Sequence, residues 1–130
     1  MATINRVVLV GNLTRDPELR STANGTSVCR LRVACSTSWR NRDSGERDER
    51  PNYFDVSVFG PSGEACARFL AKGRPVAVDG RLEWHEWTSA EGEQRQAVGI
   101  NADSVQFLAA RQGSGKEAEA VAEEEEAIAF

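Results

Sequence analysis

The most regular alternation of apolar and polar positions lies in residues 53–59, which we interpret as a strand whose side chains point to two faces in turn. One face is apolar and is the expected core side: Phe54, Val56 and Val58. The other face mixes rings with polar groups: Tyr53, Asp55, Ser57 and Phe59. Flat rings among polar neighbours suit stacking on a planar partner, and nucleic-acid bases are the commonest one. A second sheet, a loop or a subunit that covers the rings is the alternative.

The same periodicity predicts the other elements. Strands are expected at residues 4–10 and 27–37, from residue 76 onward with Val76, Val78, Gly80, Leu82 and Trp84 inward, and at 96–107. Pro61 opens a helix that carries an apolar stripe of Ala65, Cys66, Phe69 and Leu70 and stops at Gly73. Residues 13–26 contain turn signals, residues 40–50 form a charged loop, and residues 88–94 form a turn. Gly80 allows a bend or a bulge within its strand.

This order of elements predicts an all-β fold, a five-stranded OB barrel with one short helix between strands 3 and 4. A small open α+β sheet could have the same order. We expect an OB domain over residues 1–111 and a flexible linker over residues 112–122. The disordered acidic tail would then end in a protein-docking tip over residues 123–130, where two apolar side chains follow a run of carboxylates. The tip residues are Glu123, Glu124, Glu125, Glu126, Ile128 and Phe130. A purely solubilising tail is the alternative.

Composition excludes several classes of protein. The 130 residues contain no apolar stretch near the length of a membrane helix and no signal-peptide layout at the start, so we expect a cytoplasmic protein. The three cysteines, Cys29, Cys35 and Cys66, are interpreted as small buried apolar residues in a reducing compartment. His85 is the only histidine, and no zinc spacing or catalytic motif is present. We therefore expect no catalytic residues, no metal and no cofactor, and the chain is not expected to be an enzyme.

The net charge of −4 is unevenly distributed along the chain. Residues 1–112 carry a charge of +1, whereas residues 113–130 carry −5. A nearly neutral body can still contain a basic groove, so the overall acidity does not exclude a nucleic-acid partner.

Four aromatic residues are the candidates for base stacking: Trp39, Tyr53, Phe59 and Trp87. Trp87 shares the polar side of its strand, whereas Trp84 shares the core side; Trp39 lies at a strand end where bending leaves its side open. Basic residues surround the four: Arg6, Arg30, Arg32, Arg40, Arg42, Arg47, Arg50, Lys72, Arg74, Arg81 and Arg95. Rings for bases and cations for phosphates are what a flexible single strand requires. Duplex DNA fits less well, because the one predicted helix carries only two basic residues, Arg68 and Lys72.

Several segments together resemble the bacterial single-stranded-DNA-binding protein family. They are residues 5–13, 16–20, 34–39, 58–60, 69–73 and 87–88, within a resemblance that spans residues 3 to about 109. The resemblance implies an OB fold, a homo-oligomer that is usually a tetramer, and wrapping of single strands in DNA replication, recombination and repair on the nucleoid. It also implies that the acidic tip docks proteins of these processes.

The resemblance assigns roles to individual positions. The family's stacking aromatics correspond to the four rings already selected. Its phosphate contacts correspond to Arg6, Arg42 and Lys72, and the family also has a basic residue at the position of Arg20. Arg47 and Arg81, from the basic set above, complete the predicted phosphate contacts.

The chain also departs from the family pattern. The family commonly has Trp at the position of Tyr53, His at that of Phe54 and a basic residue at that of Asp55. Asp48 and Glu86 also stand where the family has basic residues. The tip ends in Ile128-Ala129-Phe130 after glutamates, where the family has aspartates and Ile-Pro-Phe. An OB-fold protein-interaction adaptor, similar to a primosome accessory and with little role in coating DNA, is therefore the alternative function.

Overall fold

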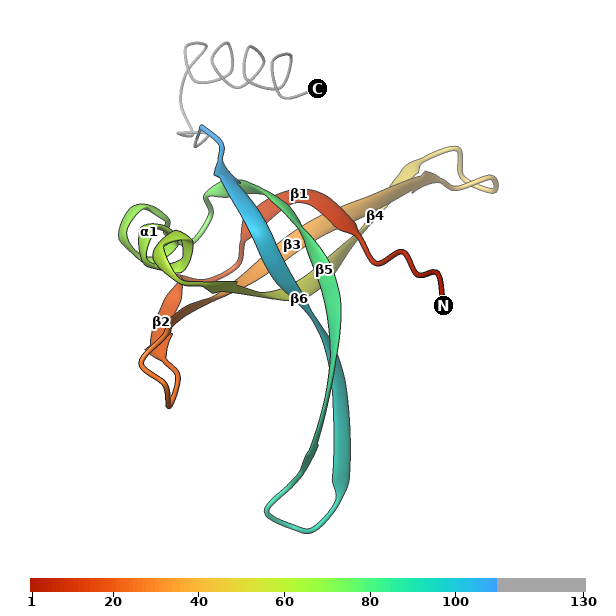
Figure 1. The fold of residues 1–130 in the computed structure, drawn as a ribbon. Coiled ribbons are helices and arrows are strands. Elements are labelled where there is room, and N and C mark those ends of the chain that lie inside the picture. The colour runs from red at the N-terminus through yellow and green to blue at the C-terminus, as the bar shows by residue number, and fades with distance from the viewer. Residues whose placement is uncertain (110–130) are drawn as a thin grey trace.

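The computed structural model describes residues 1–109, which form six strands and one helix (Figure 1). In chain order these are β1 (Val7–Leu13), β2 (Glu18–Ser21), β3 (Ser27–Arg40), β4 (Arg47–Phe59), α1 (Pro61–Phe69), β5 (Pro75–Thr88) and β6 (Gln94–Phe107). The predicted order is confirmed with one addition. β2 lies within the region predicted to consist of turns; its four residues are all exposed and show no apolar alternation.

Five of the strands close into a barrel. The sheet order is β1-β5-β6-β4-β3-β2, and β1 also pairs with β3 through Asn12 opposite Ala34 and Leu13 opposite Val33. This last pairing joins the two ends of the sheet, so the OB barrel is confirmed and an open α+β sheet is excluded. Strand β2 is an appendage that pairs only with the first part of β3.

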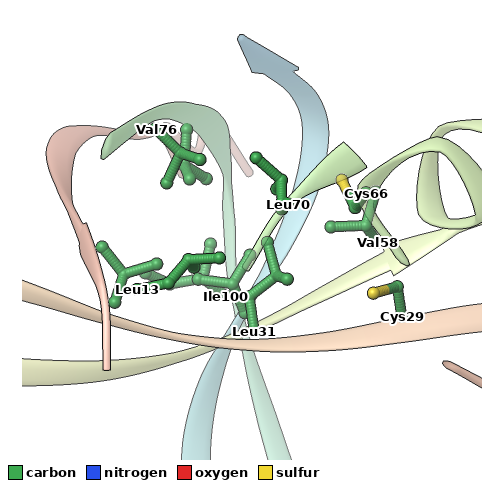
Figure 2. Close-up of a cluster of buried hydrophobic side chains, with 11 residues drawn as sticks. Leu13, Cys29, Leu31, Val58, Cys66, Leu70, Val76 and Ile100 are labelled. Atoms are coloured by element: carbon green, nitrogen blue, oxygen red, sulfur yellow. The ribbon is translucent and has the colours of Figure 1, made fainter. Parts of the chain in front are cut away.

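The barrel encloses one apolar core, shown in Figure 2. Its buried members come from the inward positions of the strands, from α1 and from the residue that follows α1: Leu13, Cys29, Leu31, Val33, Val56, Val58, Cys66, Leu70, Val76, Val78 and Ile100. Helix α1 lies close to the barrel at Gly63, where an added Cβ would overlap the carbonyl oxygen of Val58. Phe69, predicted to belong to the apolar stripe, is instead 58% exposed, and its ring lies 6.4 Å from the Phe107 ring between centroids.

Two hairpins extend beyond the barrel as arms, one from β3 and β4 and one from β5 and β6 (Figure 1). The second arm begins near a register shift between Asp79 and Gly80, which agrees with the predicted bulge. Beyond it, the predicted inward positions are wrong: Leu82 is 47% exposed and Trp84 57% exposed. Among residues 1–109, no opposing layer covers the inner face of β5 once the strand has left the barrel, so alternation there no longer implies burial.

Strand ends differ from the prediction for similar reasons. β1 begins at Val7 and ends at Leu13, because Leu13 is buried beside β3 whereas Ile4 is 98% exposed. The charged loop shrinks to residues 41–46, since pairing between β3 and β4 continues to Arg40 opposite Arg47. Polar side chains on a solvated arm do not prevent pairing of the two backbones.

The cysteines are free thiols in two environments. Cys29 and Cys66 are buried, and desolvation raises the pKa of the Cys29 thiol. Burial, followed by the neighbouring Cys29, raises the pKa of Cys66 to about 11. Cys35 is only half-buried and its thiol donates to the carbonyl oxygen of Val10 at 3.2 Å, so the prediction that all three are buried is wrong for Cys35.

Candidate nucleic-acid interface

The outward face of β3 and β4 holds two of the four predicted stacking rings. Tyr53 and Phe59 are 53% and 42% exposed, as the alternation in β4 predicted, whereas Phe54, expected on the core side, is also 38% exposed. Six positions of an extended strand separate them, a span of about 20 Å. We call this face, from Tyr53 to Phe59 with its neighbours on β3 and β2, the ring row.

Cross-strand register places two arginines between the rings. Arg30 lies opposite Ser57 and Arg32 opposite Asp55, both on the outward side of β3. The side chain of Arg30 makes no ion pair or hydrogen bond within residues 1–109 and is exposed. Neither arginine belongs to the predicted phosphate set, although the alternation along the strand already puts both side chains on its outward side. Only the pairing of the two strands shows that they lie beside the rings.

Arg20 joins the same face from β2. It pairs with Val28 on β3, which in turn pairs with Phe59 on β4, so the three side chains lie side by side across the sheet. Its guanidinium is 3.5 Å from the carboxylate of Glu18 and remains 62% exposed. Of the predicted phosphate contacts, Arg20 therefore lies level with a ring of the ring row.

Trp39 lies on the arm of β3 and β4, opposite Asp48. Its parity along β3 puts it on the other side of the ribbon from Tyr53, which settles the side that the sequence left open. It is 48% exposed and borders a depression of about 460 Å³ that is lined also by Ser38, Arg40, Gly45 and Arg47. Arg47, a predicted phosphate contact, donates to the Ser38 hydroxyl at 2.9 Å.

Trp87 lies on the other arm, opposite Arg95 and 48% exposed. Trp84 projects from the opposite side of the same ribbon, where it pairs with Val98 and donates its indole N–H to Gln96 at 3.1 Å. The stacking candidates thus occupy three places: the ring row and both arms.

The remaining predicted phosphate contacts differ in availability. Arg6 is held by two carboxylates, Asp79 at 2.7 Å and Asp103 at 3.2 Å, and Arg81 lies 3.9 Å from Asp103. The side chains of Arg42 and Lys72 form no ion pair among the described residues and are exposed. An arginine between two carboxylates offers little net positive charge to a phosphate, so Arg6 is the least suited of the set.

Other site predictions have no counterpart to examine. The tip residues 123–130 lie outside the described residues. Within residues 1–109, no three His, Cys, Asp or Glu side chains are grouped to hold a metal ion, and no helix has the length and hydrophobicity to cross a membrane.

An OB barrel whose outer surface carries exposed rings interleaved with guanidinium groups defines a class, the OB-fold proteins built to take up an unpaired strand. Comparison with known families gives the same assignment. The chain belongs to the single-strand binding protein family, whose sequence model matches residues 4–108. The resemblance inferred from the sequence motifs is thereby confirmed.

Individual relatives agree with this assignment. The chain is 43% identical over 120 residues to a single-stranded DNA-binding protein of Treponema pallidum (strain Nichols), covering 92% of this chain and 66% of the relative. A deletion mutant of the single-stranded DNA binding protein from Thermus aquaticus superposes with a TM-score of 0.71 at 32% identity, over 81% of this chain and 50% of that one. The chain thus spans between half and two thirds of the length of these relatives.

A third match concerns the fold alone. The Plasmodium falciparum SSB, solved in complex with ssDNA, superposes with a TM-score of 0.74 at 22% identity, over 83% of this chain and 97% of that one. It supports the same barrel architecture at low sequence identity.

Proposed function

We propose that this protein binds single-stranded DNA with little regard to sequence, by stacking bases on exposed rings and neutralising phosphates with the adjoining cations. The ring row is the observation that supports this best: Tyr53 and Phe59 are half exposed, with Arg20, Arg30 and Arg32 on the same face. Every base has a π face, so such a surface tolerates any sequence. Coating of this kind protects single strands during replication, recombination and repair.

The arms extend the proposed path. Trp39 and Trp87 lie on different hairpins, and Arg42 and Arg47 border the first of them. A flexible strand can cross from the ring row to the Trp39 side of the β3–β4 arm and also reach Trp87 on the other arm, whereas a duplex is too stiff to do so. The helix offers no alternative, since Arg68 lies over the Phe69 ring at 5.9 Å and no basic recognition face is present on α1.

Titration with oligo(dT) tests this function. Trp39 and Trp87 emission should be quenched on binding, and log affinity should fall with log salt by about 0.7 for each phosphate contact. A duplex of equal length is the control and should bind more weakly. Unchanged emission with a long oligonucleotide at low salt would contradict the proposal.

A second candidate, a protein-interaction adaptor, is favoured by one observation. Leu82, Trp84 and Val98 leave an apolar surface on the inner side of the β5–β6 arm, exposed by 47%, 57% and 61%. An exposed apolar surface of this kind is typical of a protein contact. An adaptor would retain a protein on this surface and give no response to oligonucleotide.

We further propose that the protein works as a homo-oligomer, expected as a tetramer, on the nucleoid. The acidic tip, with Glu123–Glu126 followed by Ile128 and Phe130, is proposed to dock replication, recombination and repair proteins. Such a partner would need a basic pocket that receives the Phe130 ring and its terminal carboxylate.

A further inference from the structure

Tyr53 does not present a free ring on the ring row. The Arg32 guanidinium carbon lies 5.2 Å from the Tyr53 ring centroid, a cation–π distance. On its other side, Arg32 lies 3.7 Å from Asp55, its direct partner across the two strands. The Asp55 side chain is 69% exposed. The three groups form a chain from carboxylate to guanidinium to ring on the face proposed to receive DNA.

This arrangement opposes DNA binding in two ways. The guanidinium of Arg32 covers one face of the Tyr53 ring. A base can stack on that face only if it displaces Arg32, so one of the two stacking faces is obstructed. A phosphate that approaches Arg32 also meets the negative charge of Asp55, which partly offsets the charge of that cation.

We propose that Asp55 and Arg32 form an electrostatic latch over Tyr53 that lowers the affinity of the ring row for single-stranded DNA and favours its release. The inference rests on the proposed function. The latch modulates binding and does not block it, because an ion pair as exposed as this one is weak and screened by salt. While Asp55 holds Arg32, this cation is not available as a full phosphate contact, and its guanidinium stays over the Tyr53 ring.

Asp55→Asn tests the latch. The amide keeps the shape of the side chain and removes its charge, so Arg32 becomes a full phosphate contact. Affinity for oligo(dT) at 50 mM salt should rise, by roughly three- to tenfold, and the salt slope should steepen by about 0.7, the value of one single-strand phosphate contact. Between 50 and 200 mM salt, this variant should therefore lose about threefold more affinity than the unmodified protein loses.

Two further variants make the test specific. Glu91→Gln removes one negative charge from the exposed β5–β6 turn, outside the ring row, and should leave both quantities unchanged. Arg32→Gln added to Asp55→Asn should return the salt slope to the original value, because the released cation is gone. Thermal unfolding midpoints confirm that all variants are folded.

The results separate the latch from the proposed function. If the unmodified protein binds no oligo(dT), the function itself fails. If it binds, and Asp55→Asn changes neither the affinity nor the slope, only the latch is overturned. A gain that persists unchanged after Arg32→Gln also overturns it, because the effect would then come from the charge of Asp55 alone.

Discussion

Two neighbouring residues of β4 lie in opposite environments, one in the core and one on the exposed ring row. Val58 is 1% exposed and lies in the core, whereas Phe59 is 42% exposed on the ring row. The two-residue period of a strand is sufficient for this division, because adjacent side chains point to opposite faces. Stability and binding should therefore separate between two consecutive positions.

Replacement of each residue by alanine tests this separation. Val58→Ala should lower the free energy of unfolding by roughly 2 kcal/mol through lost burial and a cavity, with little change in DNA affinity per folded molecule. Phe59→Ala should leave stability nearly unchanged and weaken binding to oligo(dT), oligo(dA) and oligo(dC) alike, by about 1–3 kcal/mol. Urea denaturation and fluorescence titration measure the two effects. A loss confined to one base would contradict stacking as the mode of contact.

The buried thiols make stability depend on alkaline pH. The pKa of Cys66 is raised to about 11 by burial and then by Cys29, from an ordinary value of 9.0, so the unfolded chain loses this proton first. The stabilisation is complete below pH 9 and is lost as pH rises through about 11.

We expect the urea midpoint to fall between pH 9 and pH 11, and the fall to be smaller in Cys66→Ala, which lacks the titrating group. Comparison with this variant removes the contribution of lysine and tyrosine titration. Equal pH dependence of the unmodified protein and of Cys66→Ala would contradict the assignment of this effect to Cys66.

In the native protein at pH 8, a thiol reagent should modify Cys35 faster than Cys29 or Cys66, because only Cys35 is partly exposed.

At the scale of elements, the β5–β6 hairpin is a strand pair with two different faces. Trp87 lies opposite Arg95 on one face, and Trp84 lies opposite Val98 on the other. Both indoles are about half exposed, so exposure alone does not distinguish them. The outer face continues toward the polar side of β5, and the inner face continues from the core.

This pair of tryptophans provides a matched experiment. Trp87→Ala should weaken oligo(dT) binding by about 5- to 150-fold, the equivalent of 1–3 kcal/mol of stacking. Trp84→Ala should leave that affinity within about twofold, since its ring lies on the other face of the same ribbon. Oligomer mass measured in parallel shows whether Trp84 supports a subunit contact. Similar losses in both variants would mean that DNA contacts both faces of the arm.

At the scale of the whole molecule, charge divides the chain into two parts. Residues 1–112 carry +1 and residues 113–130 carry −5, and the two parts are covalently linked. A linked acidic segment competes for a cationic surface at an effective concentration in the millimolar range. Its effect should weaken as salt screens the attraction.

Truncation after Gln112 should therefore raise affinity for oligo(dT) at low salt, with a difference that shrinks toward 200 mM salt, and should abolish docking of partner proteins. The full chain should have a mass in solution of four times 14.2 kDa. The truncated chain should also have four times its own, smaller mass, because the OB domain is expected to build the tetramer. Unchanged affinity at low salt would rule out self-competition.

Much of the site was predictable because it depends on short-range alternation. The outward positions of Tyr53, Phe59 and Trp87 follow from a period of two within single strands. The ion pairs of Arg6 and Arg32 could not be predicted in this way. Arg6 is paired with Asp79 and Asp103, far away in the sequence, and Arg32 meets Asp55 only through the register of β3 with β4.

By itself, the sequence determined the order of the barrel strands and the helix, the two-residue alternation of the barrel strands and the concentration of net negative charge in the last 18 residues, all of which depend on local pattern. The tertiary structure alone decided that β1 closes on β3, that the strand carrying Leu82 and Trp84 leaves the barrel near Gly80, and which cations are free. Burial and ion pairing depend on what lies across from a residue. Contacts between distant segments settle that, and no local period encodes it.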